Sequence, residues 1–149
     1  MAPELMTPEE MALICGRAYR HMRPWSAQDF AQALTGRFAL MCHDRQAFVL
    51  GQVIADEAEI HALACDPAVQ GRGLGSGVLV AFEAQARARG AALVALEVAE
   101  DNAPARRFYL WHGYQLAARR KAYYPRHDGL AADALILRKM LEAGERTGE

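Results

Sequence analysis

The stretch that decides the fold is Cys65-Asp66-Pro67-Ala68-Val69-Gln70-Gly71-Arg72-Gly73-Leu74-Gly75-Ser76-Gly77. It follows a strand predicted at Glu59–Cys65 and opens an amphipathic helix that is predicted to run from Leu74 to a stop at Gly90. Glycines at such a junction let successive backbone N–H groups turn inward without Cβ clashes, and the helix N-terminus adds partial positive charge. The segment therefore predicts a cradle for phosphate.

The glycine spacing distinguishes between phosphate-binding motifs. A Walker loop needs a lysine and a Ser or Thr after its last glycine, and this segment has no lysine. The dinucleotide fingerprint fails because Ser76 stands where its third glycine should be. The pattern Gln70-x-x-Gly73-x-Gly75 fits, and it resembles the pyrophosphate loop of the GNAT superfamily of N-acetyltransferases. The alternative is a glycine-rich turn that only joins a strand to a helix.

Hydrophobic periodicity and turn residues outside this segment predict a mixed α/β domain over residues 1–149. A capping box at Thr7 and Glu10 starts a helix that should reach about Arg20, and Ser26 starts a second one that Gly36 closes. The remaining predicted elements are strands at Phe38–His43, Ala47–Ala55 and Glu59–Cys65 in an antiparallel meander, a strand at Ala92–Val98 covered on both faces, a helix at Ala103–Trp111, and strands at Tyr114–Ala118 and Asp133–Met140.

Composition excludes several classes of protein. The chain has 149 residues, 52% hydrophobic, which argues against disorder, and no apolar run is long enough to span a membrane. A net charge of −1 without a basic stripe argues against nucleic acid as a partner. Cys15, Cys42 and Cys65 are scattered without CxxC spacing, which indicates reduced thiols, a cytoplasmic protein and no metal site. We expect a monomer or a weak homodimer.

A second signature supports the resemblance. The stretch 96–114 reads as a strand, an Asn, a short helix with a Tyr, then a Gly and an aromatic residue. With Pro24-Trp25-Ser26 and the stretch 119–125, it is similar to the RimI-type ribosomal-protein-alanine N-acetyltransferases from about Arg23 to Met140. Two features depart from the family: an opening strand is scarcely visible in Met1–Met6, and Ala132 stands where a Glu is usual.

The resemblance implies a single-domain GNAT fold, with a central, mostly antiparallel twisted sheet flanked by helices. It implies acetyl-CoA as cofactor, no metal, and a protein N-terminus as acceptor, with a ribosomal protein as the candidate. The implied cofactor-binding residues are a splayed strand at Leu63, Ala64 and Cys65, the turn residues Gln70, Gly71, Arg72, Gly73, Leu74, Gly75 and Ser76, and Asn102 before the short helix. The alternatives are an ordinary buried edge for the strand and plain N-capping for Asn102.

The resemblance also implies the catalytic pair. Tyr109 matches the tyrosine near the coenzyme A sulfur and would be the general acid for the thiolate, although it also has the spacing of a core aromatic residue. Glu97 matches the proposed general base, and a carboxylate within an apolar strand is costly unless it has partners or a function. His61 and His112 are rival bases. The implied acceptor-binding residues are Trp25, Tyr123, Tyr124 and Asp133.

Two other functions remain open. The same fold could acetylate a small amine or a lysine side chain, and the aromatic pair Tyr123-Tyr124 favours a peptide over these. A non-catalytic acyl-CoA sensor would tend to lose Tyr109 and Glu97, and this chain has both.

Overall fold

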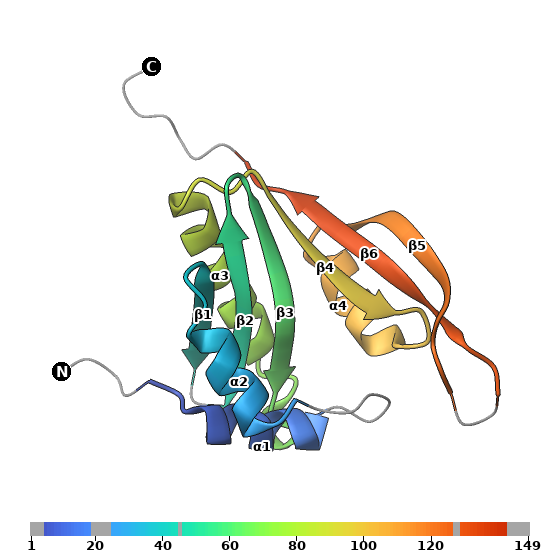
Figure 1. Ribbon diagram of the computed structural model, residues 1–149, viewed down its shortest axis with the longest axis horizontal. Coiled ribbons are helices and arrows are strands. Elements are labelled where there is room, and N and C mark those ends of the chain that lie inside the picture. Colours follow the sequence, from blue (N-terminus) through green and yellow to red (C-terminus); the bar gives the residue numbers. More distant parts are fainter. Residues whose placement is uncertain (1–4, 19–24, 45, 127–128, 143–149) are drawn as a thin grey trace.

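A computed structural model describes residues 5–18, 25–44, 46–126 and 129–142 of the chain. Its centre is a six-stranded sheet in the order β1-β2-β3-β4-β6-β5, in which only β3 and β4 are parallel neighbours (Figure 1). The strands are β1 (Ala39–Asp44), β2 (Ala47–Ile54), β3 (Glu57–Cys65), β4 (Leu93–Ala99), β5 (Gln115–Tyr124) and β6 (Ala132–Met140). The helices are α1 (Pro8–Ala18), α2 (Ala27–Leu34), α3 (Leu74–Ala88) and α4 (Ala103–Trp111), with a 3-10 turn η1 at Pro67–Val69.

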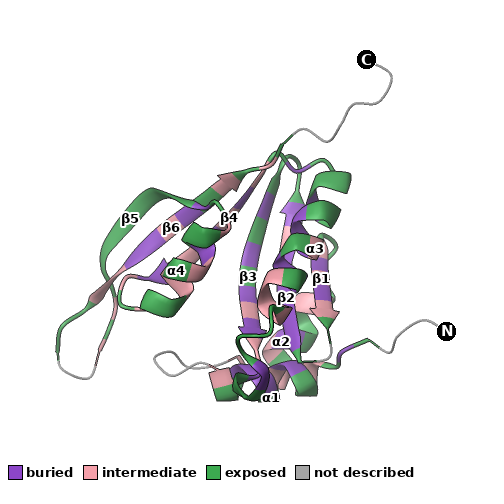
Figure 2. Ribbon diagram, turned by 180° about the vertical axis from the view of Figure 1, so that it is seen from behind, coloured by how far each residue is buried: buried purple, intermediate pink, exposed green. Residues whose placement is uncertain are grey.

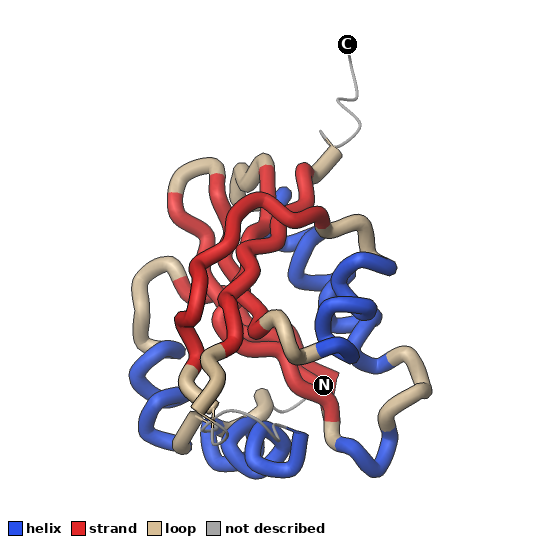
Figure 3. Tube along the Cα trace, turned by 90° about the vertical axis from the view of Figure 1, so that its right-hand side faces the viewer, coloured by secondary structure: helices blue, strands red, loops and turns tan. Residues whose placement is uncertain are grey.

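Helices cover both faces of the sheet (Figure 3). One core lies under α3 and α4, around Phe82, Val94 and Tyr114. A second core lies under α1 and α2, around Phe30 and Phe48. The predicted fold class, a mostly antiparallel sheet flanked by helices, is confirmed.

The first two helices begin where their capping residues predict. The Glu10 N–H donates to the Thr7 hydroxyl, and Glu10 accepts the Thr7 N–H in return. Ser26 and Asp29 form the same reciprocal pair at α2. The Trp25 ring lies 5.2 Å from that of Phe30, which closes the α2 entry as a hydrophobic staple. The predicted end of the first helix, Arg20, lies outside the described residues, as do Met1–Glu4 of the opening segment.

A β-bulge in β3 changes the face of the sheet to which the side chains after it point. Leu50 pairs with Ala62 and Gly51 pairs with Ile60, so His61 is an extra residue in β3. Because of this extra residue, Ile60 packs into the core under α3, whereas Ala62 packs into the core under α1 and α2. Strict alternation would put both side chains on one face.

The bulge lies where β3 and β4 separate. The pairing between the two strands joins Glu57–Ile60 of β3 to Leu93–Leu96 of β4 and goes no further. It stops one residue before the bulge. β3 continues along β2 to Cys65, while β4 continues along β6 to Ala99. The result is a V-shaped gap between two halves of the sheet, which is visible in Figure 1.

Two strands differ from their predictions. β5 runs to Tyr124, six residues past its predicted end at Ala118. Its polar and charged residues lack apolar alternation because β5 is an edge strand, exposed along nearly its whole length (Figure 2). β4 was predicted to be covered on both faces, and this is wrong: Val94, Leu96 and Val98 are buried, but Ala95 and Glu97 on the other face are only partly covered.

Candidate active site

The glycine-rich turn has the backbone geometry of an anion cradle. Gly71 (φ +87°) and Gly73 (φ +80°) both adopt conformations that favour glycine. Gly73 is the N-cap of α3, and no side chain caps the first turn of this helix. A Cβ atom at either glycine would meet nothing within 4 Å, so the space in front of the turn is open. Uncapped N–H groups beside open space fit a diphosphate.

Side chains hold this turn against the rest of the protein. The Gln70 side chain donates to the Cys65 carbonyl (3.2 Å), which ties the turn to the end of β3. The Asp66 carboxylate accepts from Arg17 of α1 at 3.0 Å and from the Ala68 N–H at 3.1 Å. The turn is therefore anchored before any ligand binds, while Arg72 is exposed.

The first turn of α3 also contacts α4. The Ser76 hydroxyl and His112 Nε2 are hydrogen-bonded at 2.8 Å, and the His112 ring lies against Phe108. Burial lowers the pKa of His112, although Glu83 opposes this shift. His112 is thus joined to the glycine-rich turn through Ser76.

Leu63, Ala64 and Cys65, the predicted cofactor-binding strand, form the β3 side of the gap. Each pairs with β2, and none belongs to the register with β4. Ala64 is buried in the core under α1 and α2, and Leu63 and Cys65 are half-buried against the other core. The splay predicted for this strand is confirmed.

Asn102 caps α4. Its side-chain oxygen accepts the Ala105 N–H at 3.3 Å, so the capping role is established. Its amide nitrogen donates no hydrogen bond to the described residues. Contact with a cofactor remains a prediction.

Tyr109 is buried in α4 with 6% of its surface exposed. Its ring makes edge contacts with Phe108 (5.1 Å) and Tyr114 (5.4 Å). Burial raises the pKa of Tyr109 well above its ordinary value, so its phenol stays protonated at physiological pH. Both interpretations of this residue, core aromatic and proton donor, are compatible with this position.

Tyr114 and Glu83 form a separate buried polar group. The Tyr114 hydroxyl donates to Glu83 at 2.8 Å, and Lys139 of β6 donates to the same carboxylate at 3.1 Å. These bonds join α3, the turn after α4, and β6. We regard the group as structural because its members satisfy one another.

Glu97 lies on the face of β4 opposite to α4, where β4 no longer pairs with β3 but still pairs with β6. The Tyr124 hydroxyl donates to Glu97 Oε2. Arg120 Nη1 lies 3.7 Å from Glu97 Oε1, and the Glu97 side chain is 28% exposed. Burial and this hydrogen bond raise the pKa of Tyr124. A carboxylate, a phenol and a guanidinium therefore meet beside the gap.

Asp133, predicted as an acceptor ligand, makes hydrogen bonds within the protein, and contact with an acceptor remains a prediction. One of its carboxylate oxygens accepts the Ala122 N–H and the other accepts from Arg119, both at 2.8 Å. Arg119 also donates to Glu100 at 2.8 Å. Both oxygens of Asp133 are thus engaged within the protein, in a network that holds β5 to β6.

The other predicted acceptor residues have different neighbours. Tyr123 contacts Tyr124 ring to ring at 5.1 Å and is half exposed. Trp25 packs against Phe30, and among the described residues no hydrogen bond or ring contact joins it to Glu97 or Tyr124. Pro24, from the same motif, lies outside the described residues.

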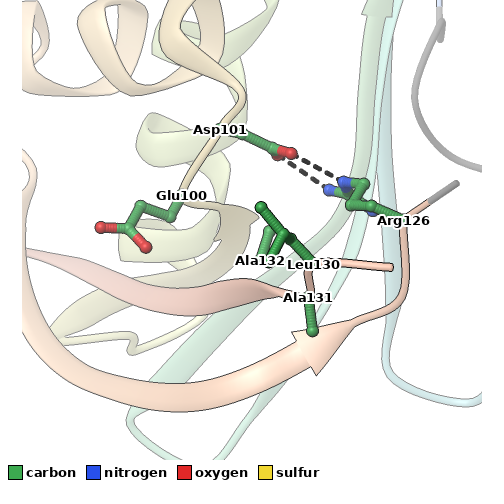
Figure 4. Close-up of a pocket in the computed structure, with 6 residues that line it drawn as sticks. All are labelled: Glu100, Asp101, Arg126, Leu130, Ala131 and Ala132. Atoms are coloured by element: carbon green, nitrogen blue, oxygen red, sulfur yellow. Dashed lines mark hydrogen bonds and ion pairs between the residues drawn. The ribbon is translucent and has the colours of Figure 1, made fainter. Parts of the chain in front are cut away.

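A cavity of about 260 Å³ opens at the far end of β4. Figure 4 shows the doubly hydrogen-bonded pair between Asp101 and Arg126 at one side of it. Its lining residues are Glu100, Asp101, Arg126, Leu130, Ala131 and Ala132. Ala132, where the family usually has Glu, therefore lies in the cavity wall.

Sequence reasoning missed Arg119 and Arg120 as site residues, because a cluster of three basic residues is usually a solvated surface. Their position in the sequence could have indicated this role, because both lie between the strand predicted at Tyr114–Ala118 and the Tyr123-Tyr124 pair. Within the described ranges, no group of His, Cys, Asp and Glu is arranged to hold a metal ion, and no helix is long and apolar enough to cross a membrane.

Comparison with known proteins agrees with this geometry. Residues 10–114 match the acetyltransferase (GNAT) family. The chain is 33% identical over 121 residues to the [ribosomal protein bS18]-alanine N-acetyltransferase of Haemophilus ducreyi, which covers 78% of this chain and 83% of that protein. It is 37% identical over 121 residues to the protein of the same name from Escherichia coli K12, with 78% and 81% covered.

Solved structures give the same result. The crystal structure of the ribosomal-protein-S18-alanine N-acetyltransferase from Escherichia coli superposes with a TM-score of 0.79 at 34% identity, over 93% of this chain and 91% of that one. Naa20 from Chaetomium thermophilum, in complex with a bisubstrate analogue, shares the fold with a TM-score of 0.74 at 20% identity, over 93% and 85%. The chain therefore belongs to the GNAT acetyltransferase family, and within it resembles the ribosomal-protein-alanine N-acetyltransferases.

Proposed function

We propose that this protein transfers the acetyl group of acetyl-CoA to the α-amine of a protein N-terminus. The observation that carries the proposal is the position of Glu97, a partly exposed carboxylate beside the gap between β3 and β4. The names of the relatives from Haemophilus ducreyi and Escherichia coli support the same acceptor class.

The proposed cofactor site combines the glycine-rich turn with the β3 edge that does not pair with β4. The N–H groups from Gly71 to Ser76 would hold the diphosphate, and the β3 edge from Leu63 to Cys65 would hold the pantetheine arm. Acetyl-CoA supplies an activated thioester whose carbonyl carbon accepts a neutral amine. Backbone N–H groups aimed at the developing oxyanion are worth about 3 kcal/mol each in other acyl-transfer enzymes.

The two proposed catalytic residues lie on opposite faces of the sheet. Tyr109 belongs to the core under α3 and α4, and Glu97 points to the other face. The amine would enter from the side of Glu97, which takes its proton. Tyr109, protonated at physiological pH, would give a proton to the departing thiolate.

The chemistry favours an α-amine over a lysine side chain. The reference pKa is about 7.7–8.0 for the α-amine and about 10.4 for lysine. At pH 7.5 roughly a third of α-amines are neutral, against about one lysine in a thousand. A single carboxylate base suits the acceptor that needs less help. We further propose that the acceptor is a ribosomal protein, and that the enzyme works in the cytoplasm as a monomer or a weak homodimer.

A pH–rate profile of Glu97→Gln tests the proposal. The variant should lose about 10²-fold or more in kcat/KM at pH 7, and the loss should shrink towards pH 9, where most of the acceptor is already neutral. Glu57→Gln is the matched control, because this exposed carboxylate of β3 makes no ion pair with the described residues. A uniform loss across the pH range would remove Glu97 from the role of base.

A further inference from the structure

β5 contains an unusual backbone feature beside Glu97. Ala122 has φ +53°, a left-handed conformation that a residue with a Cβ atom rarely adopts. It lies inside a register shift, because Arg120 pairs with Ala134 and Tyr124 pairs with Ala132. Four steps along β5 thus face two steps along β6. Such a conformation persists only where the surroundings hold it.

This bulge brings two side chains to one carboxylate. Arg120 and Tyr124 are four residues apart, which in a regular strand would separate them by about 13 Å. The bulge compresses this interval to two steps of β6, or about 7 Å. Arg120 therefore reaches one oxygen of Glu97 while the Tyr124 hydroxyl reaches the other.

Asp133 makes hydrogen bonds to the bulge. It accepts the N–H of Ala122 itself, the residue with the left-handed backbone, at 2.8 Å. Its second oxygen accepts from Arg119 at 2.8 Å, on the other side of the same bulge. The hydrogen bond from Ala122, followed by that from Arg119, lowers the pKa of Asp133, so the carboxylate is ionised at physiological pH.

We infer that Asp133 is a positioning residue of the proposed acetyl transfer: it fixes the Ala122 bulge and so places Tyr124 on Glu97, instead of binding the acceptor. The inference rests on the proposed function of Glu97. A positioning role and an acceptor-ligand role require different properties of the Asp133 side chain, and an experiment can distinguish them. A ligand for a cationic amine needs the charge of Asp133, whereas the bulge needs an oxygen that accepts the Ala122 N–H.

Three variants distinguish the two roles. Asp133→Ala removes both bonds and should lower kcat/KM for an N-terminal peptide by about 10-fold, with the acetyl-CoA KM unchanged. Asp133→Asn keeps an acceptor for Ala122 and should stay within about 3-fold of wild type. Ala122→Gly, added to Asp133→Ala, should recover part of the loss because glycine adopts the left-handed conformation unaided. Equal losses in the Asn and Ala variants, or no recovery when Ala122→Gly is added, would overturn the inference.

A double-mutant cycle with Tyr124→Phe tests the route through Tyr124. If Asp133 acts through this hydroxyl, adding Asp133→Ala to the Tyr124→Phe variant should lower kcat/KM by less than about 2-fold, not by a further 10-fold. Additive losses would contradict the inference, since a general loss of stability would lower activity in either background. Thermal unfolding of each variant is measured in parallel. A wild-type protein that acetylates no N-terminal peptide would instead refute the proposed function.

Discussion

Gly51→Ala is the substitution that tests how the fold opens its active site. Gly51 lies in β2 opposite the β3 bulge, where backbones approach so closely that no side chain fits. An added Cβ would collide with the Glu59 carbonyl oxygen and would lie 3.0 Å from a ring carbon of Phe82. The first neighbour is backbone, so it cannot rotate away, and the second is a fully buried ring.

The size of the effect follows from these contacts. Overpacking a core by one methyl group typically costs about 1–3 kcal/mol. Because the Glu59 carbonyl cannot move away, we expect Gly51→Ala to lower the free energy of unfolding by about 3 kcal/mol, the upper end of this range. For a domain of this length each kcal/mol lowers Tm by about 2–4 °C, so we expect a decrease of about 6–12 °C. The acetyl-CoA KM should rise as well. A displaced bulge would move Leu63–Cys65, the part of β3 that follows it and is proposed to bind the cofactor.

Thermal unfolding followed by circular dichroism measures this change. Gly16→Ala is the matched control: it adds the same methyl group, in the exposed part of α1, where a Cβ atom meets nothing within 4 Å. Replacing a helical Gly by Ala should stabilise the protein by about 0.5–1 kcal/mol. If Gly51→Ala unfolds within about 2 °C of wild type, the bulge does not depend on Gly51 and the explanation of the gap is wrong.

Three further predictions concern the site. Tyr109→Phe should lower kcat by about 10²-fold and leave the acetyl-CoA KM nearly unchanged in steady-state assays, and wild-type turnover would return Tyr109 to the core aromatics. Gly73→Glu puts a charged side chain at φ +80° in the cradle and should abolish acetyl-CoA binding in calorimetry, so an unchanged affinity would refute the cradle. Because the pKa of His112 is lowered in the folded protein, its contribution to stability is present above about pH 6.5 and is lost as the pH falls through the folded value. His112→Gln should therefore flatten the decline of urea stability between pH 7 and pH 5, and an identical decline would contradict this.

Local patterns in the sequence predicted most of the helices and strands. The capping pair Thr7 and Glu10 marked the start of α1, and the glycines before Leu74 marked the start of α3. These features depend on neighbours within a few residues, so a single sequence contains them. The predicted catalytic roles of Glu97 and Tyr109 came from the family resemblance, which also rests on short sequence motifs.

Features that depend on distant partners were not predictable in this way. The end of β5 was missed because its residues are paired with β6 while facing solvent, so no apolar alternation marks the strand. The bulge at Ala122 depends on a hydrogen bond to Asp133, eleven residues further along the chain. The role of Trp25 as the staple of α2 depends on Phe30, and its motif suggested only a ligand.

The most direct test of the central claim locates the transferred acetyl group. The enzyme and acetyl-CoA are incubated with a peptide that has a free N-terminal alanine and an internal lysine, and tandem mass spectrometry identifies the modified nitrogen. Acetyl should appear on the α-nitrogen at least about 10²-fold faster than on lysine, since at pH 7.5 the neutral fractions differ by that much or more. Equal or faster modification of the same peptide with a blocked N-terminus, or of a small polyamine, would contradict the claim.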